Sequence, residues 1–133
     1  MSLAIKTLLP DCKVIGVEPQ HCRSFEAALK HGQPVKADVK PTLADGLAVP
    51  TVGPHAFDVA RRYVDDVVAV DERMIALSML RLLENEHSVV EGGGAAGLAA
   101  LLPGGPLDLP EYKDKNIVVL LCGANIDIAT LGR

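Results

Sequence analysis

Short β-branched runs alternate along this chain with stretches of helical periodicity, and the alternation limits the folds open to it. Residues 13–18 and 66–70 are β-branched runs that predict strands. Apolar residues recur at helical spacing over 72–85, and Asp71 is suited to N-cap that helix. Strands that alternate with helices predict a parallel sheet. We therefore expect an α/β fold with an open, mostly parallel, twisted sheet and helices on both faces.

The remaining elements are predicted from local signals. Pro19 should end the first strand, because proline cannot donate to a ladder, and Gly32 should end a helix over 24–31. The segment 33–55 contains several Pro and Gly residues and is predicted to be a long functional loop. Further helices are expected at 56–63 and 95–102, the tail of another at 4–9, and strands at 88–90 and 116–122. The chain has 133 residues, the size of one domain, and no internal repeat is visible. Residues 1–133 should therefore form a single α/β domain.

Composition narrows the class of partner. Only 3% of residues are aromatic, so Val, Leu, Ile and Ala must fill the core, as in a buried parallel sheet. The net charge of −4 and the lack of a Lys/Arg cluster argue against nucleic acid and against an anionic membrane surface. No stretch approaches the roughly 20 apolar residues that cross a bilayer, and the amino terminus has no signal-peptide pattern. We expect a cytoplasmic protein that binds a small molecule.

The three cysteines, Cys12, Cys22 and Cys122, are an odd number at wide spacings. They resemble neither a disulfide framework nor a zinc site built on cysteine pairs. A reducing compartment fits this pattern best.

The segment 91–97, Glu-Gly-Gly-Gly-Ala-Ala-Gly, matches the GxGxxG pattern between a predicted strand and a helix. A dinucleotide-binding fingerprint also needs an acidic residue at the end of the next strand, and that strand runs instead into Cys122-Gly123. Two other interpretations remain open. The small residues allow close packing of helix on strand, or they let a cofactor or substrate approach the backbone beside Glu91.

Other polar groups follow predicted strands or lie in the long loop. Glu18-Pro19 and the segment 122–125 stand at the carboxyl ends of strands, where open parallel sheets bind ligands. Asp45-Gly46, taken alone, is an ordinary turn signal, and a lone Cys122 is more often buried filler than a functional group. Together with Glu91 these groups mark four candidate polar sites at one edge of the predicted sheet.

The order and spacing of five segments resemble the fold-type II pyridoxal-phosphate enzymes, in the branch of threonine deaminase, serine dehydratase and serine racemase. The segments are 14–19, 42–49, 67–72, 90–97 and 118–127, so the resemblance covers nearly the whole chain. It implies part of the large cofactor-binding domain of an ammonia-lyase. Such an enzyme dehydrates L-serine or L-threonine to ammonia and a 2-oxo acid, with racemisation as a further activity of the group. A small hydroxy-amino acid is the implied partner.

The resemblance also implies roles for individual residues. Cys122 matches the position that meets the pyridine nitrogen of pyridoxal 5′-phosphate, where a neutral partner suits β-elimination of water. Glu91 matches an acidic residue near the cofactor, and Asp45-Gly46 matches a loop that lines the active site. The implied cofactor-binding residues are Cys122, Glu91, Gly92, Asp45, Gly46 and Gly123.

A cation site is a weaker implication. Glu18 matches a carboxylate that binds a divalent cation in racemase-like members, together with the backbone carbonyl of Cys22. The second carboxylate of that site corresponds to Ser24, and a hydroxyl is a poorer ligand for a hard cation. A divalent cation, a monovalent cation and no cation all stay open.

The catalytic machinery of the family has no match among these residues. The Ser-x-Lys-x-Arg-Gly-like motif with the Schiff-base lysine, the Ser-x-Gly-Asn-His-like loop and the glycine tetrad that grips the phosphate are all missing. No catalytic residue is therefore assigned. We expect the carboxy-terminal portion of such an enzyme, inactive alone. The alternative is a non-catalytic truncated protein that binds a small molecule or dimerises, and a third interpretation, ranked below both, is an NAD-binding Rossmann-like domain. Strands left without partners would form exposed apolar edges, which predicts a homo-oligomer.

Overall fold

The computed structural model describes residues 1–127, so residues 128–133 of the predicted domain lie outside the described part. Two strands and five α-helices follow one another in the order α1, β1, α2, α3, β2, α4, α5 within that part. Their bounds are α1 Ser2–Leu8, β1 Ile15–Pro19, α2 Ser24–His31, α3 Pro54–Tyr63, β2 Asp66–Val70, α4 Glu72–Glu86 and α5 Gly92–Ala99. Two short 3-10 turns, Asp45–Leu47 and Pro110–Tyr112, lie in the loops.

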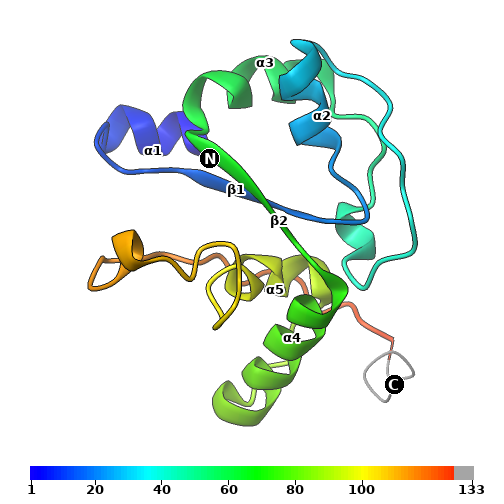
Figure 1. Ribbon diagram of the computed structural model, residues 1–133, viewed down its shortest axis with the longest axis vertical. Helices are drawn as coiled ribbons and strands as arrows, with labels where there is room; N and C mark the ends of the chain where they lie inside the picture. The colour runs from blue at the N-terminus through cyan, green and yellow to red at the C-terminus, as the bar shows by residue number, and fades with distance from the viewer. Residues whose placement is uncertain (128–133) are drawn as a thin grey trace.

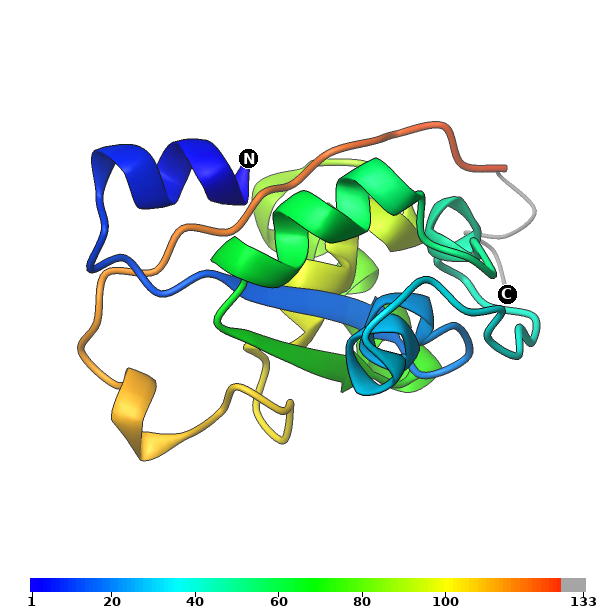
Figure 2. The ribbon, with the colours of Figure 1, turned by 90° about the horizontal axis from the view of Figure 1, so that it is seen from above.

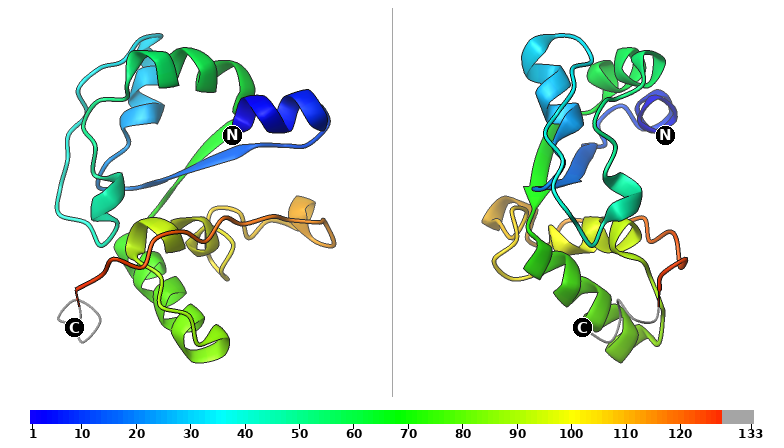
Figure 3. Two further views of the ribbon diagram at one scale, coloured as in Figure 1. Left: turned by 180° about the vertical axis from the view of Figure 1, so that it is seen from behind. Right: turned by 90° about the vertical axis from the view of Figure 1, so that its right-hand side faces the viewer.

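The sheet consists of β1 and β2, which pair in parallel from Ile15 opposite Asp66 to Pro19 opposite Val70. Helices α1, α2 and α3 lie on one side of the strands, and α4 and α5 lie on the other (Figure 1). The two further views in Figure 3 show the same division. The prediction of an α/β fold with a parallel sheet and helices on both faces is confirmed.

Most of the local predictions agree with the structure to within two residues. Asp71 caps α4 as expected, since its Oδ1 accepts a hydrogen bond of 2.7 Å from the Met74 N–H. Helix α2 has the predicted bounds and ends at Gly32 in the left-handed conformation (φ 71°). Helix α3 begins at Pro54 rather than at residue 56, because proline is well suited to the first position of a helix.

Strand β1 ends one residue later than predicted. Pro19 belongs to the strand although it has no N–H to donate, because the next residue, Gln20, donates to the Val70 carbonyl over 2.8 Å. A proline at the last position of a strand costs the ladder little.

The predicted strands at 88–90 and 116–122 are wrong. Residues 115–127 cross the molecule as an extended segment (orange to red in Figure 2), but within residues 1–127 no strand pairs with either segment. A strand requires hydrogen bonds to a neighbour, which the β-branched pattern cannot supply by itself. The segment 116–122 therefore leaves apolar side chains in contact with solvent, and Val118 is 89% exposed.

Helix α5 also departs from the prediction. The helix expected at 95–102 instead begins at Gly92 and ends at Ala99, so that three consecutive glycines form its first turn. Glycine is a poor helix former, so packing decides this start. Two of its glycines lie against backbone of other segments, which leaves no room for a side chain.

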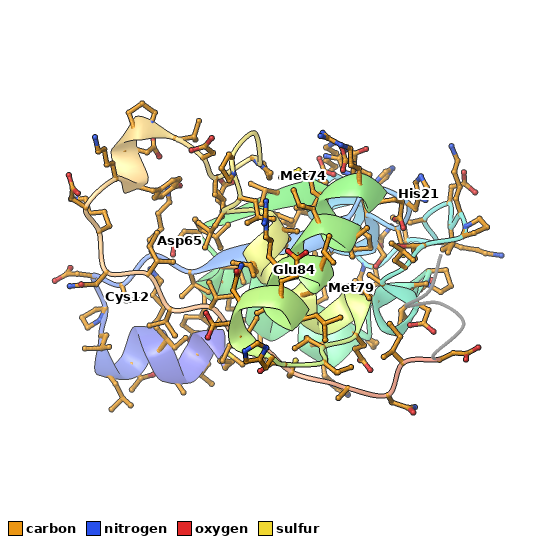
Figure 4. The ribbon with its side chains drawn as sticks, turned by 90° about the horizontal axis from the view of Figure 1, so that it is seen from below. Cys12, His21, Asp65, Met74, Met79 and Glu84 are labelled. Atoms are coloured by element: carbon orange, nitrogen blue, oxygen red, sulfur yellow. The ribbon has the colours of Figure 1, made fainter. Side chains whose placement is uncertain are left out.

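The core lies between β2, α4 and α5. Ile75, Ala95 and Ala99 are fully buried there. Met74 and Met79 of α4 belong to the same cluster and are labelled in Figure 4. The buried Ser78 hydroxyl lies 2.8 Å from the Ile75 carbonyl and 3.0 Å from the Ala95 carbonyl, and it joins α4 to α5. Of the helices in residues 1–127, none is long and apolar enough to span a membrane.

Candidate functional site

Both strands end at one edge of the sheet, and a glutamate lies near the end of each strand. The pairing of Pro19 with Val70 places Glu18 near the end of β1 and Glu72 just beyond the end of β2. The two Glu18 oxygens accept hydrogen bonds from the N–H groups of Phe25 (2.8 Å) and Glu26 (3.0 Å). These are unpaired donors in the first turn of α2, where the helix dipole favours a negative charge. Glu18 therefore fixes the start of α2 to the sheet.

A cavity of about 300 Å³ opens beside Glu18. Ser24, which is 6% exposed, and Gly46 contribute to its wall. Cys22 is buried, and its thiol donates to the Val49 carbonyl over 3.3 Å. In the described part of the chain, no three His, Cys, Asp or Glu side chains gather as metal ligands would. The cation site at Glu18, Cys22 and Ser24 stays a prediction.

Glu91 is the meeting point of three segments. Its N–H donates to the Gly123 carbonyl over 2.9 Å, and its Oε2 accepts from the Asn125 N–H at 3.1 Å. A β-carbon added at Gly46 would lie 3.6 Å from Glu91 Oε1, and one added at Gly123 would overlap the carboxylate. Gly123 has φ 83°, a conformation open to glycine. The predicted residues Gly46, Glu91 and Gly123 are thus brought together.

The glycines of α5 are in contact with the chain's own backbone. A side chain at Gly92 would overlap the Leu43 carbonyl, and one at Gly94 would overlap the Cys122 carbonyl. Close packing therefore accounts for these two positions, although their partners are loop segments and not the strand that one of the open interpretations expected. The side chain of Cys122 is exposed, while Asp45 accepts a local hydrogen bond of 2.8 Å from the Gly46 N–H.

Several lysine side chains form ion pairs or hydrogen bonds with other side chains in the described part of the chain. Lys6 pairs with Asp65 at 2.7 Å, and Lys30 pairs with Glu26 at 2.7 Å. The hydrogen bond from Lys13 to the Tyr112 hydroxyl raises the pKa of the Lys13 ammonium. A nucleophilic lysine needs the opposite change. None of these three has the character of a Schiff-base residue.

One polar network was missed by the sequence analysis. Glu72 accepts hydrogen bonds from the Thr42 hydroxyl and the Leu43 N–H, and His21 lies beside it. The available signal was its position directly after Asp71 at the end of a predicted strand, the same placement that drew attention to Glu18.

The fold defines an α/β protein in which Glu18 and Glu72 lie at the carboxyl ends of parallel strands, the usual location of ligand sites in such sheets. A family model described as "Pyridoxal-phosphate dependent enzyme" matches residues 1–123. The chain belongs to this family.

Individual relatives agree with the family. The chain is 42% identical over 133 residues to L-threonine ammonia-lyase from Thermotoga maritima, covering 100% of this chain and 32% of that protein. Among solved structures, a processed form of threonine deaminase isoform 2 from Solanum lycopersicum matches with a TM-score of 0.88 and 30% identity, over 96% of this chain and 37% of that one. Maize serine racemase matches with a TM-score of 0.86 and 30% identity, over 98% and 40%. The chain thus spans about a third of the length of the Thermotoga relative.

Proposed function

We propose that this chain contributes part of the cofactor site of a pyridoxal-phosphate-dependent ammonia-lyase that dehydrates L-serine or L-threonine. The observation that carries the proposal is the position of Glu91, held between Gly46 and Gly123 next to Cys122. The likeness to threonine ammonia-lyase and threonine deaminase supports the same reaction class. Racemisation is a second outcome of the same chemistry, supported by the likeness to serine racemase.

The chemistry of these residues fits the cofactor. Pyridoxal phosphate, when bound, supplies an electron sink for the substrate carbon that loses a proton. The exposed Cys122 thiol is a neutral, weak hydrogen-bond donor suited to an unprotonated pyridine nitrogen. Glu91 and the Asp45-Gly46 turn would border the ring. Gly123 allows the backbone to lie against the Glu91 carboxylate, and Gly92 allows the Leu43 backbone to lie against the start of α5.

The experiment is a titration of the 133-residue chain with pyridoxal 5′-phosphate, followed by absorbance and by protein NMR shifts. We expect saturable binding that Cys122→Ala and Glu91→Gln weaken and that Lys36→Gln leaves unchanged. Wild-type chain that shows no saturable shift would overturn the assignment of the cofactor site.

We also propose that the chain has no dehydratase activity alone, because no lysine of the family's Schiff-base motif occurs in it. Incubation with pyridoxal 5′-phosphate and L-threonine or L-serine should yield no 2-oxo acid above a protein-free control. Sustained 2-oxo acid formation would contradict this. The alternative function is a non-catalytic domain that binds a small molecule or dimerises. It also predicts no 2-oxo acid, but unlike the proposed function it predicts no binding of pyridoxal 5′-phosphate.

The broader expectations remain proposals of the same kind. We propose a single α/β domain over 1–133 that works in the cytoplasm on a small hydroxy-amino acid, without nucleic-acid or membrane partners. Exposed Val118, Leu120 and Leu121 support self-association. Light scattering should report a homo-oligomer, and a monodisperse monomer would contradict it.

A further inference from the structure

Glu72 forms hydrogen bonds with the loop that leads to the candidate site. It is the first residue of α4, and its two oxygens accept separate hydrogen bonds of 2.6 Å from the Thr42 hydroxyl and the Leu43 N–H. The Thr42 oxygen in turn accepts from the Ala44 N–H at 3.1 Å. Hydrogen bonds to an ionised carboxylate are among the stronger ones in proteins.

His21, in the turn that follows β1, contacts the same loop. Its backbone carbonyl accepts from the Lys40 N–H at 2.9 Å, and its Nδ1 lies 2.5 Å from the Pro41 carbonyl. Because a carbonyl can only accept, Nδ1 carries the hydrogen in this contact. The same nitrogen is 3.5 Å from Glu72 Oε1. Figure 4 shows His21 at the end of the molecule opposite Cys12 and Asp65.

Thr42 and Leu43 come directly before the part of the loop that borders the candidate site. The Leu43 carbonyl lies against Gly92, where no side chain would fit, and Ala44 is fully buried. The next residue but one, Gly46, borders both Glu91 and the cavity. Glu72 itself is not among the residues that line this cavity. The loop is therefore clamped between Glu72 on one side and α5 on the other.

We propose that Glu72 is a positioning residue for the candidate site: by holding Thr42 and Leu43 it fixes Asp45-Gly46 against Glu91. The link to cofactor binding rests on the proposed function, whereas the clamp itself does not. Without Glu72 the Leu43 N–H loses its acceptor and the turn can leave α5.

Backbone hydrogen exchange in the full chain tests the clamp without any ligand. Glu72→Ala removes both bonds, and Thr42→Val removes the hydroxyl while keeping a β-branched shape and leaving α4 intact. We expect exchange at Leu43 and Ala44 to accelerate about tenfold to a hundredfold in both variants. Glu72→Gln retains one acceptor oxygen and should fall between wild type and Glu72→Ala. Glu86→Ala, the same change at the other end of α4, is the matched control and should leave the loop unchanged.

Exchange within α4 separates a local from a global effect. If Glu72→Ala also accelerates exchange at Met79 and Leu82, the substitution has loosened α4 as a whole. Thr42→Val then tests the loop contact by itself, because it leaves α4 unaltered. Exchange at Leu43 equal to wild type in Thr42→Val would overturn the proposal, and selective acceleration at Leu43 would support it. Exchange at Ala44 is not used for this decision, because Thr42→Val also removes the acceptor of the Ala44 N–H.

A titration with pyridoxal 5′-phosphate gives the second readout. Glu72→Ala and Thr42→Val should raise the apparent Kd, while Glu86→Ala should not. Faster hydrogen exchange in the loop together with an unchanged Kd for pyridoxal 5′-phosphate would overturn the positioning role. If wild-type chain binds no cofactor, the proposed function fails while hydrogen exchange still decides whether Glu72 holds the loop.

Discussion

Gly94 lies directly against the carbonyl oxygen of Cys122, so closely that a β-carbon at residue 94 would overlap that oxygen. The contact joins the first turn of α5 to the extended segment that carries the candidate cofactor residue. A similar contact joins Gly92 to Leu43 on another side of the same turn. Because Gly92 and Gly94 have no side chains, α5 can lie directly against two backbone segments that are distant from each other in sequence.

Gly94→Ala should destabilise the protein although alanine is the better helix former. The added carbon must push the 122–123 backbone away, and overpacking of this kind costs about 1–3 kcal/mol. Gly93→Ala is the matched control, because a β-carbon there would make ordinary contacts, 3.5 Å from Leu47. It should gain up to about 1 kcal/mol from helix propensity. Urea unfolding measures both; equal effects of the two substitutions would contradict the contact.

Asp65 should make stability depend on pH at the acid end. The Lys6 ammonium first, and then the Val14 N–H, hold the pKa of the Asp65 carboxyl below its ordinary 3.8. The charged form is therefore favoured in the folded state. Its stabilisation is fully present above the ordinary value and is lost as the pH falls through 3.8 towards the lower folded-state pKa.

Asp65→Asn tests this contribution in denaturant unfolding at several pH values. The variant should be less stable than wild type at pH 7, and the difference should shrink below pH 3.8. Asp11→Asn, a change at another exposed carboxylate, serves as the control. A penalty for Asp65→Asn that stays constant down to acid pH would show that the charge of Asp65 does not contribute.

The three thiols should differ in reactivity in the native protein. Cys12 and Cys122 are exposed, whereas Cys22 is 1% exposed and donates to the Val49 carbonyl. A thiol reagent should therefore modify Cys12 and Cys122 rapidly and Cys22 only on unfolding. Mass spectrometry of the time course identifies the sites. Rapid modification of Cys22 in the native chain would contradict its burial, and Cys22→Ser should leave the fast phase unchanged.

Glu18→Ala should destabilise α2 by about 1–3 kcal/mol, because two N–H groups in its first turn lose their acceptor. Thermal unfolding with and without Mg²⁺ or Ca²⁺ separates this role from cation binding. A cation held at Glu18 would raise the Tm of wild type and not that of Glu18→Ala. An equal rise in both proteins would argue against the cation site. Glu84→Ala on the exposed side of α4 is the control.

Much of the fold was predictable where neighbouring residues determine the structure. Asp71 followed by an apolar pattern of period 3.6 specified α4, and a β-branched run specified β2 with its observed bounds. The ordered motifs around Glu18, Asp45, Glu91 and Cys122 were sufficient to indicate the family that the comparison then showed. For α4 and β2 the signal lies within a few residues of the feature it predicts.

The site was predictable only in part. The residue types at Gly46, Glu91 and Gly123 were identified, but their meeting depends on contacts between segments more than 30 positions apart, such as the bond from Asn125 to Glu91. Glu72 was not identified, because its partners Thr42 and Leu43 lie in a loop without periodicity. Local pattern carries no information about which distant N–H a carboxylate will accept.

The sequence by itself therefore determined the α/β class, the helices with clear periodicity and caps, and the set of residues from which a site could be built. Only the tertiary structure decided that 88–90 and 116–122 form no strands and that a triple-glycine segment begins a helix. The physical reason is that strand pairing and close backbone packing require partners supplied by remote segments. Propensity describes what a segment can adopt, and its neighbours in space select the outcome.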